Sequence, residues 1–226
     1  YNISPESLIR YSEELPEIIR PYWRQNITDE MCHNALPPEV TKALKQHKLC
    51  IAGNGEIFRT DIDAVIPRLV RKMFAARREA KKEMLKCKKI YEADNTRLDM
   101  KALAGILSVK EQAYKICLNS LYGAFGSEWF CLFEVCLAAA VTLSGQGYIR
   151  HCERKFNEYL SGITGKRDYI IAIDTDSLYI DLGPLQAKFG LDQAALTQAI
   201  DTKLQDLAAS YIDTVVDITG VTNSIM

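Results

Sequence analysis

The two aspartates of the segment Ile171–Ile180 are the residues of this chain best suited to chemistry. Asp174 and Asp176 stand two positions apart where a strongly apolar strand stops, and in extended backbone this spacing puts both carboxylates on one side. Carboxylates this close repel each other, so a divalent cation is a natural third partner. Oxygen-only ligands favour magnesium, manganese or calcium. The pair therefore predicts a metal site, and the alternative is a polar turn between two strands.

A D-x-D pair of aspartates occurs in several classes of protein. An EF-hand calcium loop is disfavoured, because Leu178 stands where the loop needs an oxygen ligand and Tyr179 where it needs glycine. Two enzyme classes stay open on the aspartates alone: sugar-nucleotide glycosyltransferases, and phosphatases whose first aspartate is phosphorylated. A second motif has to distinguish between them.

A second set of polar residues lies upstream, in the segment Lys115–Gly123. Lys115 and Asn119 are four residues apart and Tyr122 follows three residues later, so on a helix all three project from one face. That face is not the apolar one. The helix is therefore expected to bury its apolar side and to present these three residues elsewhere.

Positive charge is concentrated further upstream. The segment Arg71–Lys89 holds nine basic residues and two acidic ones, although the whole chain has a net charge of -1. The net charge alone would argue against a nucleic-acid partner, because phosphate-binding proteins usually have a basic surface. The local charge suits a phosphate-binding face as well as it suits a solvated helix face. Arg77 and Lys81 lie in this segment, four residues apart.

Two helices are expected to position these cations. Apolar residues recur with helical spacing from Ile66 to Phe74 and from Leu103 to Leu121, and the polar break Asp94–Thr96 separates the two runs. We expect one apolar face of each helix to be core. Gly123 can end the second helix or allow a close approach of the backbone to a ligand. Two long helices joined by a short polar turn should pair antiparallel.

The rest of the chain mixes strand and helix signals. Asn54-Gly55 supplies turn chemistry for a β-hairpin over Lys48–Thr60, and Tyr169–Asp181 has strand character. A long, mostly buried helical region is expected over Trp129–Leu160, and helix again from Leu185 to about residue 211.

Two classes of protein are disfavoured by composition. The longest apolar stretch, Trp129–Leu143, falls short of the length needed to cross a bilayer, so no membrane partner is expected. The seven cysteines include no C-x-x-C pair, which favours reduced, buried, intracellular thiols over a metal site.

The segment Lys115–Gly123 resembles the K-x-x-x-N-S-x-Y-G motif of the fingers in family B DNA polymerases. It stands upstream of the D-T-D-S segment, which is the order that this family shows. Val65-Ile66-Pro67 followed by Arg77 and Lys81 is similar to the first fingers helix of the family. Asn2–Glu6 is similar to the segment after the first catalytic motif in the large tailed-phage branch.

This resemblance implies an α+β fold, with an antiparallel β palm and packed helices plus a two-helix antiparallel fingers hairpin. Residues 1–60 would be the N-terminal part of the palm, 61–125 the fingers, and 126–226 the C-terminal part of the palm with the D-T-D-S hairpin. The first catalytic motif, an aspartate followed by S-L-Y-P, is expected immediately before residue 1. The exonuclease domain and the thumb are absent, so the isolated fragment is expected to be inactive.

The resemblance also implies roles for the site residues. Asp174 and Asp176 would bind two Mg²⁺ ions, for which Mn²⁺ can substitute, and would be catalytic together with Lys115. The nucleotide-binding residues would be Arg77, Lys81, Lys115, Asn119 and Tyr122. Three cations from two antiparallel helices can converge on a tetra-anionic triphosphate, where charge-assisted bonds are strongest.

The predicted function is template-directed transfer of a nucleotidyl group from a dNTP to a primer 3'-hydroxyl in DNA replication. The implied partners are primer–template DNA, dNTP and, through regions outside this chain, a sliding clamp. The expected location is the cytoplasm, that of the host if the source is viral. Two alternatives are a metal-dependent D-x-D glycosyltransferase and a catalytically inactive nucleic-acid-binding remnant.

Overall fold

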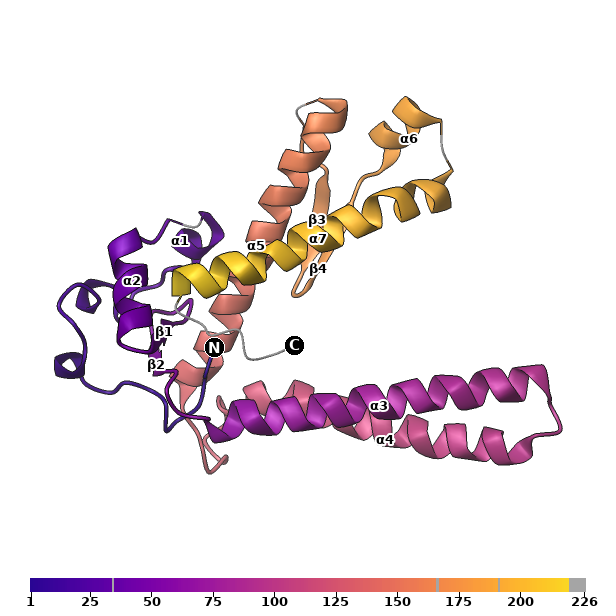
Figure 1. Ribbon diagram of the computed structural model, residues 1–226, viewed down its shortest axis with the longest axis horizontal. Coiled ribbons are helices and arrows are strands. Elements are labelled where there is room, and N and C mark those ends of the chain that lie inside the picture. The colour runs from indigo at the N-terminus through magenta and orange to yellow at the C-terminus, as the bar shows by residue number, and fades with distance from the viewer. Residues whose placement is uncertain (34, 166, 191, 220–226) are drawn as a thin grey trace.

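The computed structural model describes residues 1–33, 35–165, 167–190 and 192–219, and for residues 193 and 212–219 it describes the backbone alone. Within these residues the chain is mostly helical and carries two small antiparallel sheets, an α+β arrangement (Figure 1). Every described helix is too short or too polar to cross a membrane.

The N-terminal region packs short helices against a β-hairpin. In chain order it forms η1 (Ser12–Glu14), η2 (Arg20–Tyr22), α1 (Thr28–His33), α2 (Pro38–Gln46), β1 (Leu49–Ile51) and β2 (Ile57–Arg59). The predicted hairpin is confirmed, with Ile51 opposite Ile57 in the antiparallel register. Gly55 has a φ of +74°, and a Cβ there would lie 2.2 Å from the Gln25 carbonyl oxygen. Only glycine therefore suits this turn.

A long helical hairpin projects from this region. Helices α3 (Val65–Ala93) and α4 (Leu98–Ala124) run antiparallel and side by side, as predicted (Figure 1). The connecting turn is stabilised by Asp94, whose Oδ1 accepts hydrogen bonds from the Thr96 N–H at 3.0 Å and the Thr96 hydroxyl at 2.6 Å. A buried cluster of four residues joins the outer part of the two helices: Met84, Cys87, Ala104 and Leu107.

The apolar face predicted for α3 is only partly buried. Ile66 is buried and packs with Phe125 and Leu137 at the base of the hairpin. Phe74, which has the spacing of a core residue, is 49% exposed. The reason is geometric, because α3 leaves the body of the protein and has α4 as its main neighbour. A single partner helix covers only a narrow stripe of the surface of α3.

Helix α5 (Val135–Thr164) is the central element, in contact with α1, α4, α6, α7 and the second hairpin. The prediction that helix begins near Trp129 was wrong, because residues 126–134 form turns and Trp129 is 90% exposed. The chain turns back there, and the Glu134 N–H donates to the Phe125 carbonyl oxygen at 3.0 Å.

The C-terminal region contains a second β-hairpin and two helices. These are β3 (Ile170–Asp174), β4 (Ser177–Ile180), α6 (Gly183–Phe189) and α7 (Gln193–Thr219). The inner face of the hairpin packs Ile170 and Leu178 against Phe156 of α5, with Leu204 of α7 alongside. The continuous helix predicted from Leu185 is interrupted, because Gly190 adopts the left-handed conformation and ends α6.

Candidate active site

The two aspartates lie at the tip of the β3–β4 hairpin. Asp174 is the last residue of β3, Asp176 belongs to the turn, and Asp174 is paired with Ser177 of β4. The predicted D-T-D-S hairpin is thus present, but Asp176 is not in extended backbone. Strand alternation therefore does not determine the direction of its carboxylate. Thr175 between them has a φ of 51°, which is uncommon for a residue with a Cβ.

The tip of this hairpin is accessible and polar. Asp174 and Asp176 are both exposed. The Thr175 hydroxyl donates to Asp174 Oδ1 at 3.2 Å, and the Ser177 hydroxyl donates to the Asp174 carbonyl oxygen at 3.1 Å. Exposed carboxylate oxygens are suitable ligands for Mg²⁺, which is usually held by one or two carboxylates with water and substrate phosphates. In the described part of the chain, no three His, Cys, Asp or Glu side chains gather around a common metal position.

The β3–β4 hairpin is fixed to α5 by hydrogen bonds at its open end. Asn157 of α5 accepts the Tyr169 N–H at 2.7 Å through Oδ1 and donates to Asp168 Oδ1 at 2.9 Å through Nδ2. Arg167 forms an ion pair of 2.9 Å with Asp181 across the hairpin. The strand that ends in Asp174 therefore starts from a defined position on α5.

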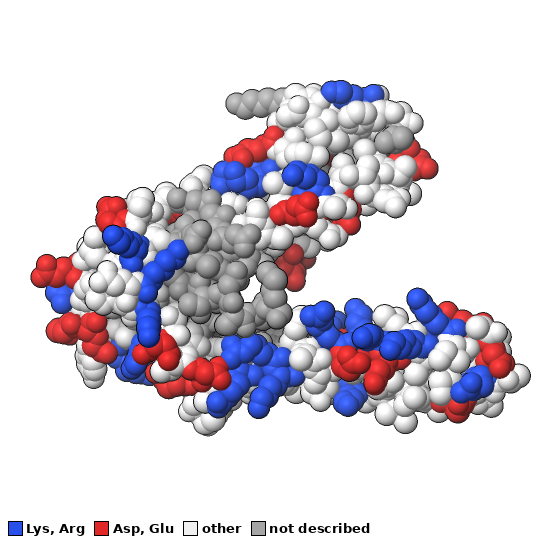
Figure 2. Space-filling model, in the orientation of Figure 1, with Lys and Arg blue, Asp and Glu red and all other residues white. Residues whose placement is uncertain are grey.

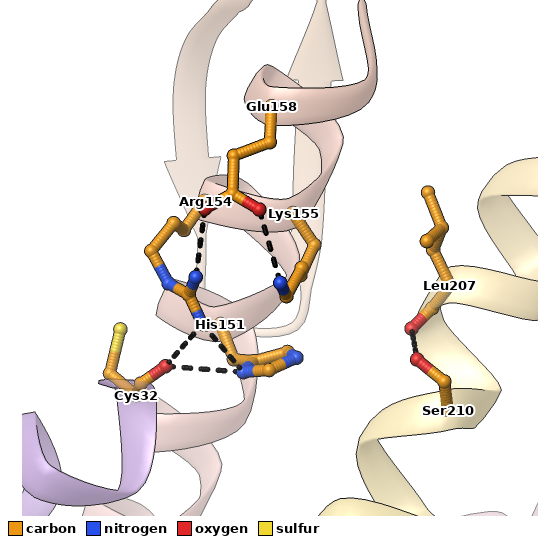
Figure 3. Close-up of polar contacts among 7 residues, drawn as sticks. All are labelled: Cys32, His151, Arg154, Lys155, Glu158, Leu207 and Ser210. Carbon is orange, nitrogen blue, oxygen red and sulfur yellow. Dashed lines mark hydrogen bonds and ion pairs between the residues drawn. The ribbon is translucent and has the colours of Figure 1, made fainter. Parts of the chain in front are cut away.

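Helix α5 is in turn attached to α1 through the polar contacts drawn in Figure 3. The His151 Nδ1 lies 3.1 Å from the Cys32 carbonyl oxygen, and Arg154 Nη2 donates to the same oxygen at 3.0 Å. Glu158 accepts hydrogen bonds from Arg154 at 2.8 Å and from Lys155 at 3.1 Å. The carbonyl group at the end of α1 is thus satisfied by two side chains of α5.

The buried imidazole of this junction is also covered by α7. The His151 ring packs against the Tyr211 ring in a tilted arrangement, with the ring centroids 4.8 Å apart. Burial lowers the pKa of His151, and the nearby cations Arg154 and Lys155 lower it further against the opposing effect of the Cys32 carbonyl. His151 is therefore neutral near pH 7 and holds α1, α5 and α7 together.

The predicted nucleotide-binding residues lie on the helical hairpin, where Lys115, Asn119 and Tyr122 are exposed on α4. Tyr122 is 47% exposed, so it is not a core aromatic residue. Gly123 does not end the helix as predicted, because α4 continues to Ala124 and Gly123 has no positive φ.

Arg77 of α3 is bound to a residue that sequence reasoning missed. Its Nε donates to Glu111 Oε1 of α4 at 2.7 Å, and the two side chains are 25% and 15% exposed. Glu111 lies four residues before Lys115, which was the available sequence signal, because this spacing puts both on one side of the helix. Lys81 is exposed and lines an open groove on the outer side of α3.

The cations and the carboxylates lie on two separate arms of the molecule. In Figure 1 the helical hairpin and the β3–β4 hairpin project on the same side of α5 with open space between them. The space-filling view shows a deep hollow there, with Lys and Arg side chains along the edge of the helical hairpin that borders it (Figure 2). The helical hairpin thus presents Lys and Arg side chains to this hollow.

The sequence profile of DNA polymerase family B matches residues 2–204, which include both arms. The chain belongs to DNA polymerase family B. Its relatives include the DNA-directed DNA polymerase of Enterobacteria phage T4, 43% identical over 81 residues, which are 35% of this chain and 9% of the relative. The DNA-directed DNA polymerase of Escherichia phage RB69 is 30% identical over 170 residues, or 69% of this chain and 18% of the relative.

A third relative of this family B chain comes from a virus of algae. The DNA polymerase of Paramecium bursaria Chlorella virus NY2A is 31% identical over 116 residues, which are 51% of this chain and 11% of the relative. The chain therefore spans less than a fifth of the length of each of these three relatives.

Proposed function

We propose that this chain is the palm-and-fingers part of a DNA-dependent DNA polymerase that extends a primer strand in DNA replication. In this proposal α3 and α4 belong to the fingers (residues 61–125). Residues 1–60 and 126–226 form the two parts of the palm. The observation that carries the proposal is the presence of exposed cations on the helical hairpin and of exposed carboxylates on the β3–β4 hairpin, in a chain that matches DNA polymerase family B over residues 2–204.

The helical hairpin would bind the triphosphate of a dNTP. Lys81 and Lys115 are exposed cations on two antiparallel helices, and Arg77 adds a planar guanidinium held by Glu111. The hydrogen bond to Glu111 is made by Nε of Arg77, so the geometry is compatible with phosphate contacts from the other two guanidinium nitrogens. Lys115 would neutralise the charge that develops on the leaving pyrophosphate and would donate a proton to it.

Asn119 and Tyr122 would meet the nascent base pair and the sugar. Both are exposed on the same helix as Lys115, four and seven residues after it, so a ligand held by the lysine would lie beside them. Their contribution would be the orientation of the nucleotide rather than the chemical step.

Asp174 and Asp176 would be ligands for two Mg²⁺ ions, or for Mn²⁺ as a substitute. When bound, such ions lower the pKa of an attacking hydroxyl and stabilise charge on a leaving phosphate. The observation that supports this assignment is that both carboxylates are exposed at the tip of the β3–β4 hairpin. Two carboxylates make a partial ligand set, so we expect residues 1–226 alone to extend no primer.

The proposed partners are primer–template DNA and dNTP in the host cytoplasm, with a sliding clamp bound through other regions of the full-length protein. The match of family B over both motifs leaves the D-x-D glycosyltransferase alternative without support. An inactive remnant that only binds nucleic acid is the remaining alternative.

Primer extension by the full-length protein tests the proposal. Asp174→Asn and Asp176→Asn should each abolish extension in Mg²⁺ while DNA binding persists, because they remove carboxylate ligands at an exposed turn. Asp206→Asn, an exposed aspartate of α7, is the matched control and should extend normally. Intact extension by both hairpin variants would refute the assignment, and inactivity of the unaltered protein would favour the remnant.

A further inference from the structure

The helical hairpin carries a second basic surface beyond the residues assigned to the nucleotide. An open groove of about 670 Å³ follows the side of α3 that faces away from α4, and it is lined by Arg78, Lys82, Lys86 and Lys89 together with Lys81. All five are exposed. We name the four residues Arg78, Lys82, Lys86 and Lys89 the α3 basic row.

The spacing of these residues makes them a line of charge. They follow one another at intervals of four, four and three residues, which keeps them on one face of the helix. At a rise of 1.5 Å per residue the row extends about 16 Å along the axis. It runs from Arg78 toward the end of α3 that is remote from α5.

The α3 basic row is little neutralised by the protein itself. Among the described residues, none of its members forms an ion pair, whereas Arg71 pairs with Asp63 and Arg77 with Glu111. One acidic residue, Glu79, lines the groove. A row of unpaired cations this close together repels itself, and an external polyanion would relieve that repulsion.

We propose that the α3 basic row binds the backbone of single-stranded DNA, namely the unpaired template strand beyond the nucleotide site. A positively charged groove that follows one phosphate chain is the usual arrangement for such binding. The triphosphate of one dNTP would bind at Lys81 and would leave the α3 basic row free. A single helix face offers a line of charge, which matches one strand better than the two strands of a duplex. The description of the strand as template rests on the function proposed above.

The salt dependence of DNA affinity in the full-length protein tests this inference. The row variant combines Arg78→Gln, Lys82→Gln, Lys86→Gln and Lys89→Gln. Each cation that neutralises a phosphate of single-stranded DNA contributes about 0.7 to the slope of log K against log salt. For a primer–template with a long single-stranded template extension, the slope should therefore fall by about 3 in magnitude. For a blunt duplex the slope should not change.

The control variant removes the same number of charges from the same hairpin. Lys72, Lys88, Lys101 and Lys110 are exposed and lie outside the groove. Their combined change to Gln should leave both slopes as in the unaltered protein. Equal losses in the row and control variants would overturn the proposal, because they would indicate general charge attraction. A loss on the blunt duplex as large as that on the extended template would also overturn it.

Two further measurements separate this inference from the proposed function. A charge-conserving variant combines Arg78→Lys, Lys82→Arg, Lys86→Arg and Lys89→Arg. Its salt-dependence slope should equal that of the unaltered protein, which would exclude misfolding as the cause of the loss in the row variant. The KM for dNTP with saturating DNA should stay unchanged in the row variant and should rise in Lys81→Ala. If Lys81→Ala leaves the KM for dNTP unchanged, the assignment of the nucleotide site is wrong, but the result on single-strand binding is not affected.

Discussion

The two arms of this chain carry opposite charge and obtain their shape in different ways. The helical hairpin α3–α4 has its own buried cluster around Met84 and Leu107 and a cross-helix ion pair between Arg77 and Glu111. The β3–β4 hairpin has no such cluster among the described residues, and its Ile170 packs into a core made with α5 and α7. The helical hairpin is therefore stabilised by contacts between its own two helices, whereas the β3–β4 hairpin is stabilised by contacts with α5 and α7.

The difference predicts how each arm responds to substitution. The cations are spread over two long helices, so the loss of one leaves others in place. The two carboxylates lie close together at the tip of the β3–β4 hairpin, and contacts of Asn157 and Ile170 fix the position of this hairpin. A substitution that weakens the packing of β3 against α5 should consequently impair catalysis more than a substitution in the core of the helical hairpin that lowers the free energy of unfolding by the same amount.

Within the helical hairpin, the largest effect is expected for Lys115→Ala in the full-length protein. Because Lys115 would donate a proton in the chemical step, kcat for primer extension should fall by about 1000-fold. Lys115→Arg retains the charge and should recover part of the binding but little of the proton transfer. Lys110→Ala, an exposed lysine of the same helix, is the control. An equal decrease in both alanine variants would contradict a special role for Lys115.

A pair of core substitutions tests whether activity depends on the packing of the β3–β4 hairpin against α5. Ile170→Ala and Leu107→Ala remove buried side chains from the two arms, and each should lower the free energy of unfolding by about 3 kcal/mol. Extension well below the melting temperature should decrease more for Ile170→Ala. Equal stability loss with equal activity loss would show that the carboxylate turn does not rely on α5.

The ion pair within the helical hairpin should have a smaller effect. If Glu111 orients Arg77 toward the triphosphate, Glu111→Gln should raise the KM for dNTP by about fivefold, which corresponds to about 1 kcal/mol. In an Arg77→Ala background the same change should add nothing, and Glu79→Gln should have no effect in either background. A lower KM in Glu111→Gln would mean that Glu111 competes with the triphosphate instead.

The smallest effect is expected on the stability of the junction around His151, where α1, α5 and α7 meet. Burial depresses the pKa of His151, so the unfolded state, with the ordinary value of 6.5, binds more protons as the pH falls. The contribution of neutral His151 to stability is complete above pH 6.5 and is lost below it. His151→Gln should flatten the decrease in melting temperature between pH 7 and pH 5.5. Parallel curves for the two proteins would contradict this role.

Local signals in the sequence predicted the elements that depend on local contacts. Asn54-Gly55 predicted the first β-hairpin, and the polar turn around Asp94 predicted the antiparallel helices. The helix start at Trp129 was wrong because a contact with Phe125 turns the chain there. The break at Gly190 was missed because its left-handed conformation is a backbone choice that spacing does not reveal.

The sequence allowed the residue types of the candidate site to be predicted, but not the contacts between them. The motif spacing identified Lys115 and the two aspartates, whose roles stay predictions. The pairing of Arg77 with Glu111 joins residues 34 positions apart. Nothing local predicts such a contact until the register of the two helices is known.

The division of work between the two arms is the central claim, and single-turnover extension at varied dNTP concentration tests it most directly. With the full-length protein, Asp176→Asn should lower the maximal rate and change the apparent Kd for dNTP little. Lys81→Ala should raise that Kd by a larger factor than it lowers the maximal rate. If both variants change the same parameter by the same factor, the two arms do not have separate roles and the account is wrong.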